Sequence, residues 1–173
     1  MRDWLLTLLI LLPALGALAV AAHRFAPYRR GETHYRWIAL AFSVATFALS
    51  LLLLDGSSGA ASGDFRFARD VPWVEAIGAR YHVGVDGISL WLVILTTLLM
   101  PISVLSSWTA VEKRPLAFFM FMMLLESAMI GVFVSLDLLL FYLFFEASLV
   151  PMFFLIGVWG GERRIYAAVK FFI

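Results

Sequence analysis

The sequence predicts an all-α protein, a polytopic transmembrane helix bundle with five full helices and the start of a sixth. Of the 173 residues, 63% are hydrophobic and only 14% are charged, far from the composition of soluble domains. A helix needs about 20 apolar residues to cross a bilayer, and runs of that length recur between charged residues. Full spans are expected at about 4–22, 35–54, 88–108, 116–136 and 138–157, and a shorter apolar run covers 165–173.

The first apolar run has a second interpretation, a cleavable signal peptide. Ala19-Val20-Ala21 resembles a small-residue cleavage site, and Arg2 precedes the run. However, Asp3 offsets Arg2, and the run is longer than the usual signal core of about 7–15 residues. A basic cluster also follows it, Arg24, Arg29 and Arg30. We therefore favour a retained transmembrane helix.

The longest connection, 55–85, is expected to be an outer loop. It begins with a Gly/Ser/Ala tract at 56–63 and continues with aromatic and apolar residues among charges. Such a segment can lie on the membrane surface, where it would cap the helices or meet a neighbouring subunit, but an ordinary solvated loop is an equal alternative. Asp86 then precedes an apolar run, so we expect it to be the N-cap of the third helix.

The distribution of Lys and Arg predicts the orientation. The first, third and fifth connections carry eight, and the opposite side carries four. Since basic residues accumulate on the inner side, the amino terminus is expected outside. The last apolar run reaches Ile173 after about two turns, so we interpret residues 1–173 as the amino-terminal part of one longer transporter domain.

Composition excludes several classes of chemistry. A net charge of +1 with scattered basic residues argues against a nucleic-acid partner. The absence of Cys removes disulfides, thiolate metal sites and iron–sulfur ligation from this chain. His23, His34 and His82 have no paired spacing. We therefore expect no cofactor and no metal ion in this chain.

Two glutamates inside apolar spans are the candidate site. Glu146 lies near the middle of 138–157, where a charged side chain costs about 2.5–3.5 kcal/mol on insertion scales. Such residues usually face a protein interior or a water-filled path, so the position of Glu146 predicts proton or ion handling. The alternative is a neutral acid that only ties helices together. Glu126 lies ten residues before Leu136 and Glu146 ten after it, which places both about 15 Å from the intervening turn. Whether they face each other does not follow from the sequence, and Glu126 is either a secondary proton-path or tuning residue or a helix contact.

Neighbouring residues add to this site. Tyr142 lies one turn before Glu146 on the same helix face, so its hydroxyl can reach the carboxyl group; Ser148 is a weaker candidate. Pro151 cannot donate a backbone N–H, which frees the carbonyl of Ala147. Lys170 could accept a proton, although extension to the membrane surface is the favoured interpretation.

Three stretches carry a resemblance to a known family. They read GVFVSLDLLLFY at 131–142, FEASLVPMFFLIGVWGG at 145–161 and ERRIYAAVKFF at 162–172, and GVDGIS at 84–89 fits as well. This pattern resembles the antiporter-like subunit M (chain 4) of respiratory complex I. The match begins near Tyr81, and residues 1–80 fit only in hydropathy.

The resemblance implies a proton-translocating membrane subunit of a NADH:quinone oxidoreductase, which couples quinone reduction to proton pumping. In that family a fifth-helix glutamate, here Glu146, pairs with a lysine on a seventh helix, beyond this sequence. NADH, FMN, iron–sulfur clusters and quinone would bind in partner subunits. The implied partners are other complex I membrane subunits, including neighbouring antiporter-like subunits, and the lipid bilayer. The implied location is a cell inner membrane, bacterial in preference to organellar.

Two alternatives stay open. A Mrp-type sodium/proton antiporter or a membrane-bound hydrogenase uses homologous subunits with a similar glutamate. A nontransporting scaffold subunit is the other, and it predicts that removal of the Glu146 carboxyl group leaves pumping unchanged.

Overall fold

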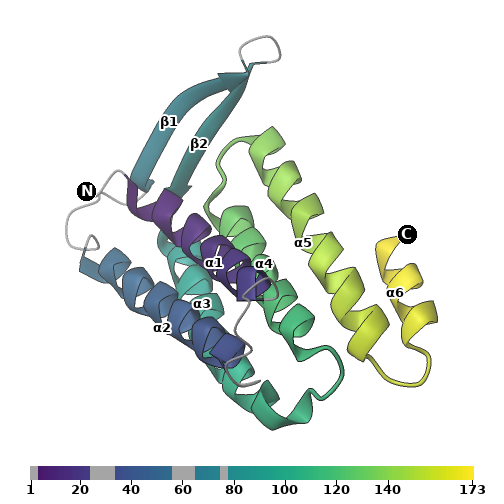
Figure 1. The fold of residues 1–173 in the computed structure, drawn as a ribbon. Coiled ribbons are helices and arrows are strands. Elements are labelled where there is room, and N and C mark those ends of the chain that lie inside the picture. The colour runs from purple at the N-terminus through teal and green to yellow at the C-terminus, as the bar shows by residue number, and fades with distance from the viewer. Residues whose placement is uncertain (1–3, 24–33, 56–64, 75–77) are drawn as a thin grey trace.

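The computed structural model describes residues 4–23, 34–55, 65–74 and 78–173, and within these it contains six helices and one β-hairpin (Figure 1). The helices are α1 (Leu5–Ala22), α2 (His34–Asp55), α3 (Gly87–Ala110), α4 (Pro115–Val134), α5 (Leu138–Trp159) and α6 (Arg164–Phe172). The predicted helical fold is confirmed, and each helix lies within two residues of its expected bounds. Helices α1 to α5 are long and apolar enough to cross a membrane, which indicates a membrane protein.

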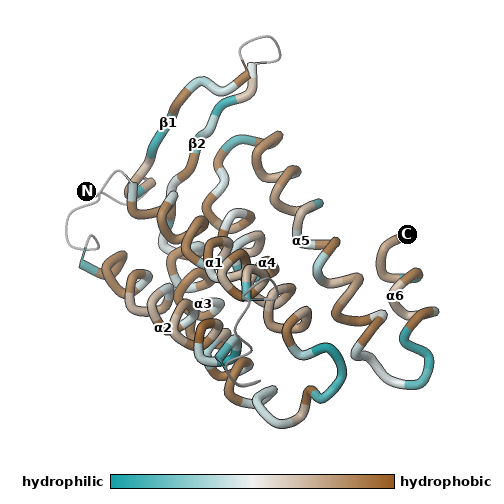
Figure 2. Tube along the Cα trace, viewed as in Figure 1, coloured by the Kyte–Doolittle hydropathy of each residue, from teal (hydrophilic) through white to brown (hydrophobic). Residues whose placement is uncertain are grey.

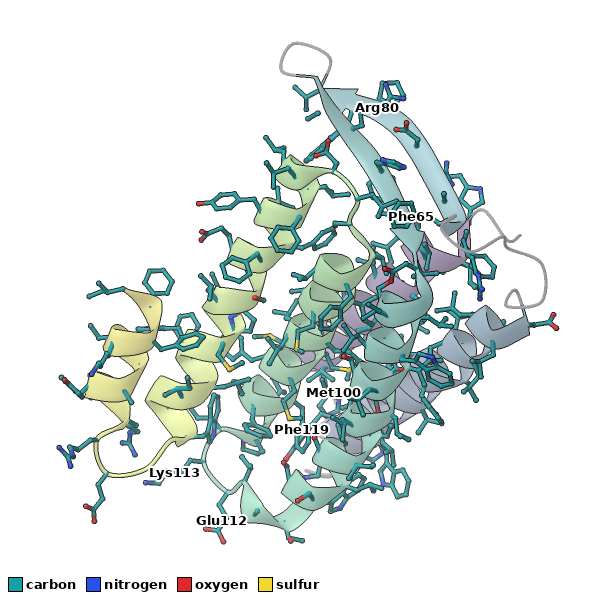
Figure 3. All side chains as sticks on the ribbon, turned by 180° about the vertical axis from the view of Figure 1, so that it is seen from behind. Phe65, Arg80, Met100, Glu112, Lys113 and Phe119 are labelled. Atoms are coloured by element: carbon teal, nitrogen blue, oxygen red, sulfur yellow. The ribbon has the colours of Figure 1, made fainter. Side chains whose placement is uncertain are left out.

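The helices form a four-helix group with two helices attached on one side (Figure 1). Helix α1 packs on α4 and α2, and α3 packs on α2 and α4. Helix α5 packs on α4, and α6 packs on α5. Figure 2 shows apolar helices with hydrophilic residues gathered in the α3–α4 and α5–α6 connections. Figure 3 places Glu112 and Lys113 at the end of the bundle opposite to Arg80.

Local sequence explains where two of the helices begin. The Asp86 side chain accepts hydrogen bonds from the backbone N–H groups of Ile88 and Ser89, and the Ser89 hydroxyl accepts one from the Asp86 N–H at 2.9 Å. This capping box confirms the predicted N-cap. Asp137 caps α5 in the same manner and accepts from the N–H groups of Leu139 and Leu140.

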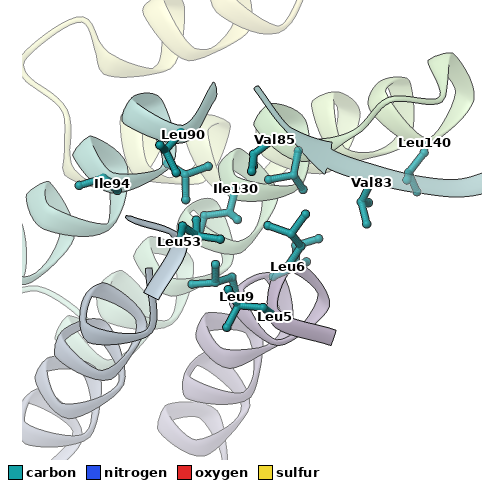
Figure 4. Packing of buried hydrophobic residues seen from close by; sticks show 13 residues of the cluster. Leu5, Leu6, Leu9, Leu53, Val83, Val85, Leu90, Ile94, Ile130 and Leu140 are labelled. Atoms are coloured by element: carbon teal, nitrogen blue, oxygen red, sulfur yellow. The ribbon is translucent and has the colours of Figure 1, made fainter. Parts of the chain in front are cut away.

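Buried apolar residues form two clusters along the bundle axis. The first lies near the hairpin, where side chains from α1, α2, α3, α4, α5 and β2 converge (Figure 4). Its members include Leu9, Leu53 and Ile130. The second lies toward the other end and includes Met100 and Phe119, labelled in Figure 3. Both clusters draw on α1 to α4, so these four helices share one core.

The long connection contains a β-hairpin that the sequence did not predict. Strand β1 (Arg66–Val74) pairs antiparallel with β2 (Ala79–Val85), and Gly78 adopts φ +69° in the turn, a conformation glycine tolerates. In β2 the consecutive residues Val83, Gly84 and Val85 are all buried, so this end of the strand is covered on both faces. The Gly/Ser/Ala tract at 56–63 lies outside the described residues.

The hairpin caps one end of the bundle. The hydroxyls of Thr7 and Tyr81 are 2.9 Å apart, and the Leu136 N–H donates to the His82 carbonyl at 2.8 Å. The Arg69 guanidinium carbon lies 3.3 Å from the centroid of the Trp4 ring, a cation–π contact. Of the two interpretations left open for this segment, the structure therefore matches a cap on the helices.

Candidate functional site

Glu146 lies on the face of α5 that points away from the four-helix group. Phe144 of α5 packs against Gly131 of α4, so the contact face of α5 contains residue 144. Two residues further along a helix correspond to a rotation of about 200°. Glu146 is accordingly exposed, and few α5 residues are buried by the described part of the chain.

Tyr142 and Glu146 interact. Their side chains lie one turn apart on this exposed face, close enough for the hydroxyl and carboxyl groups to interact, and Tyr142 itself is 60% exposed. The Ser148 hydroxyl instead donates to the backbone carbonyl of Phe145 at 2.7 Å. Tyr142 is therefore the hydroxyl that the structure brings to the carboxyl group, and Ser148 is occupied by its own helix.

Pro151 lies on the opposite, buried face of α5. The helix runs through the proline, whose missing N–H leaves the carbonyl of Ala147 without its helical donor. Three residues after Pro151, the rings of Phe154 and Phe121 stack at 4.9 Å between centroids and hold α5 on α4. The free carbonyl thus belongs to the turn that follows Glu146.

Glu126 has the opposite environment. It is 0% exposed in α4, and neither carboxyl oxygen has a hydrogen-bond partner among the described residues. The adjacent Ser127 hydroxyl donates to the backbone carbonyl of Ile10 in α1 at 2.6 Å. This bond fixes the rotation of α4 against α1 and keeps the Glu126 side chain in the interior.

The structure therefore does not bring the two glutamates together. Helices α4 and α5 are antiparallel neighbours joined by a short connection at Leu136 (Figure 1). Glu126 and Glu146 are each ten residues from Leu136, so they lie at a similar level. Glu126 is enclosed by the bundle, whereas Glu146 faces outward from it. A direct carboxyl pair, one of the two arrangements the sequence allowed, is absent in this arrangement of the described helices.

Lys170 lies apart from both glutamates. Ala168 of α6 faces Gly157 of α5, and Phe172 packs on Phe153. Lys170 is two residues from Ala168 and thus points away from α5, with its ammonium nitrogen 5.9 Å from the centroid of the Tyr166 ring. In this position Lys170 is exposed.

Charged groups outside the spans are stabilised locally. Hydrogen bonds from Ser89 lower the pKa of Asp86 from its ordinary value. In the hairpin, Arg80 donates to Asp70 at 2.6 Å, which lowers the pKa of that exposed carboxyl group. The rings of His23 and His34 stack at 6.2 Å between centroids, an approach the sequence did not predict. Within the described residues, no group of three or more His, Asp or Glu is placed to hold a metal ion.

Sequence reasoning also missed a set of buried hydroxyls on α2. Ser43, Thr46 and Ser50 are each 0% exposed. Their spacing of three and four residues places them on one helix face, and this spacing was a readable signal in the sequence. They form part of a polar region near Glu126 that is described below.

Comparisons with known proteins show which family this sequence resembles. The family model described as NADH:quinone oxidoreductase/Mrp antiporter, TM, matches residues 135–173. The chain is 48% identical over 171 residues to NADH-quinone oxidoreductase subunit M of Rhodobacter capsulatus, covering 98% of this chain and 32% of that protein. It is 38% identical over 169 residues to subunit M of Rickettsia prowazekii (strain Madrid E), covering 98% and 34%. The predicted resemblance to subunit M is confirmed.

A solved structure agrees with the sequence relatives. A chain of respiratory complex I from Thermus thermophilus with bound NADH superimposes with a TM-score of 0.75 and 27% identity, over 95% of this chain and 31% of that chain. The chain thus spans about a third of the length of the curated subunit M relatives it matches. Glu146, Tyr142 and Lys170 all lie within the segment that the family model matches.

Proposed function

We propose that this chain forms part of a proton-translocating membrane subunit of a NADH:quinone oxidoreductase, and that Glu146 carries a proton at mid-membrane depth. The observation that supports this most is the placement of Tyr142 beside Glu146 inside an apolar span, on a face of α5 that the other described helices leave uncovered. A carboxyl group at this depth is costly unless it is paired or reaches water. Its presence there is what a proton path requires.

The proposed step uses this chain's own groups. The Tyr142 hydroxyl donates to the ionised Glu146 carboxylate and stabilises it. When a proton arrives, the neutral acid becomes a donor, and the tyrosine oxygen can accept from it. The free Ala147 carbonyl can hold a water molecule on the same turn. Release follows when a nearby positive charge favours the carboxylate, and we assign that charge to a lysine beyond this sequence, as the family resemblance implies.

Glu126 and Lys170 have secondary places in the proposal. Glu126 is enclosed at the same level, where it can tune the proton affinity of the region or serve a separate path. Lys170 is exposed on α6. As a proton acceptor it would pass protons toward further helices of the full-length subunit. Neither residue contacts the Tyr142–Glu146 pair.

We assign the redox chemistry to partner subunits, which would bind NADH, FMN, iron–sulfur clusters and quinone. Other membrane subunits, including antiporter-like neighbours, would cover the outer face of α5 and α6. We place the protein in a cell inner membrane with the amino terminus outside, on the basis of the basic residues in alternate connections.

A Mrp-type antiporter is the second candidate, because the matching family model is described by both names. Sealed vesicles that contain the full-length subunit in its complex distinguish the two. The proposal predicts proton uptake that needs NADH, stops when NADH oxidation is inhibited, and is unchanged when sodium is replaced by potassium. Proton movement driven by a sodium gradient without NADH would overturn it in favour of the antiporter.

A further inference from the structure

The core of the α1–α4 bundle contains a buried polar layer. Six polar side chains are less than 9% exposed in the described residues: Ser43, Thr46, Ser50, Thr97, Glu126 and Ser127. All of them except Ser127 are 0% exposed. These side chains come from α2, α3 and α4. Polar groups at such burial normally appear where they are bonded to one another, to backbone or to water.

The layer lies between the two apolar clusters. On α4, Met123 belongs to the second cluster and Ile130 to the first, and Glu126 falls between them. On α3, Thr97 falls between Ile94 of the first cluster and Met100 of the second. The polar groups of both helices therefore share one level of the bundle.

Helix α2 repeats this arrangement. Its three buried hydroxyls lie between Ala39 of the second cluster and Leu53 of the first. The hydroxyls of Ser50 and Thr97 are 2.8 Å apart and join α2 to α3. Thus α2, α3 and α4 each carry buried polar groups between the two apolar clusters, and the Ser50–Thr97 contact places two of these groups at one level.

Prolines add free backbone acceptors to the layer. Pro13 of α1 removes the donor for the Leu9 carbonyl, and Pro101 of α3 removes the donor for the Thr97 carbonyl. Ser127 donates to the neighbouring Ile10 carbonyl of α1. Such freed carbonyls in transmembrane helices are satisfied by side chains or by ordered water.

Glu126 differs from every other member of the layer. The hydroxyls of Ser43 and Thr46 each donate to a carbonyl of their own helix, and in the Ser50–Thr97 pair one hydroxyl donates to the other, which donates to a carbonyl of its own helix. Both Glu126 oxygens have no partner among the described residues. An ionised carboxylate without a partner would be strongly unfavourable in this interior. A neutral acid that bonds to water is the form compatible with the site.

No charged neighbour offsets this carboxyl group. The spans α1 and α3 contain no Asp, Glu, Lys, Arg or His. On α2 the ionisable residues, His34, Tyr35, Arg36 and Asp55, are confined to its two ends. On α5 they are Tyr142 and Glu146, which face away from α4. The Glu126 carboxyl group therefore has no charged side chain of these helices beside it.

We propose that Glu126 is a second proton-binding site, enclosed by α1 to α4, in which the neutral acid is hydrogen-bonded to water held in the polar layer. The site takes one proton and bound water as its ligands. It does not depend on the role assigned to Glu146, since it is built from different helices and lies on the other side of the α4–α5 contact.

Infrared difference spectroscopy of the full-length subunit in its complex tests this without using transport. Glu126→Gln should remove one carbonyl band of a protonated carboxylic acid, whereas Glu146→Gln should leave that band in place. The band should shift when native complex is transferred to D₂O, because water reaches the proton. Glu126→Met, which keeps a similar volume, provides a second variant should the amide disturb assembly.

Three results would overturn the proposal. Loss of a carboxylate band instead of an acid band in Glu126→Gln would show an ionised group. Loss of the same acid band in Glu146→Gln would show that the two sites are coupled. A band that is insensitive to D₂O would remove water from the site. None of these results bears on whether Glu146 transports protons, which proton-uptake measurements decide.

Discussion

Phe144 of α5 occupies the space that any side chain at Gly131 of α4 would need. A Cβ atom built on Gly131 collides with the Phe144 ring, at a separation that real Cβ atoms do not show. This close approach sets the rotation of α5 about its own axis. It follows that Glu146, about 200° around the helix, points away from the four-helix group.

Gly131→Ala should weaken the α4–α5 contact. The added methyl group forces the Phe144 ring to move, and overpacking of this kind costs about 1–3 kcal/mol. The measurement is the melting temperature of the complex in detergent. Gly157→Ala is the matched control, because a Cβ there meets the Ala168 Cβ at an ordinary 3.5 Å. Equal melting temperatures for the two variants would contradict this account of the contact.

Asp86→Ala should destabilise the start of α3 by about 1 kcal/mol, the usual cost of losing an N-cap. The pH dependence has a definite sign. Because the folded pKa of Asp86 is lowered, its contribution is present above the unfolded pKa of about 3.9 and is lost as the pH falls through the folded value. Unfolding of wild type and variant, measured between pH 7 and acid, should therefore converge at low pH. A difference that persists or grows in acid would be inconsistent with the cap.

Tyr81→Phe should loosen the hairpin cap. The change removes the hydroxyl contact with Thr7, and a lost hydrogen bond of this kind costs about 0.5–1.5 kcal/mol. Protease sensitivity of the hairpin in intact complex reports this change. Arg80→Gln serves as control: its ion pair with Asp70 is solvent-exposed, so sensitivity should stay at the wild-type level. Greater sensitivity in the control than in Tyr81→Phe would reverse this ranking.

Tyr142→Phe should slow proton uptake by about tenfold, because a hydrogen bond to a charged group contributes about 1.5–3 kcal/mol. The expected defect is in uptake by sealed vesicles, with assembly retained, since Tyr142 is exposed and packs on no core residue. Ser148→Ala should behave as wild type because that hydroxyl donates to the Phe145 carbonyl. Normal uptake in Tyr142→Phe would remove the tyrosine from the proposed step.

Helix positions and both mid-span glutamates could be predicted from the sequence because charges interrupt apolar runs of bilayer length. The N-cap at Asp86 could likewise be predicted from the sequence. The rotation of α5 was not, since it depends on how Phe144 fits against Gly131, a contact between two helices. The separate surroundings of Glu126 and Glu146 follow from that contact.

The hairpin was missed for a different reason. Charges and aromatics in 65–85 hide the strand pattern, and the burial of Val83 and Val85 can be recognised only once the bundle beneath the strand is known. The pairing of β2 with the residues before α5, through Val83 and Ser135, also joins segments far apart in the sequence. Local pattern alone does not specify such a pairing.

The central claim concerns the Glu146 carboxyl group. Glu146→Gln, made in the full-length subunit within its complex, keeps the size of the side chain and removes its ability to exchange a proton. The measurement is the ratio of protons taken up to NADH oxidised in sealed vesicles, with subunit content checked by immunoblot. The account predicts a lower ratio in fully assembled complex. A wild-type ratio at wild-type assembly would contradict it and assign Glu146 to helix packing in a scaffold.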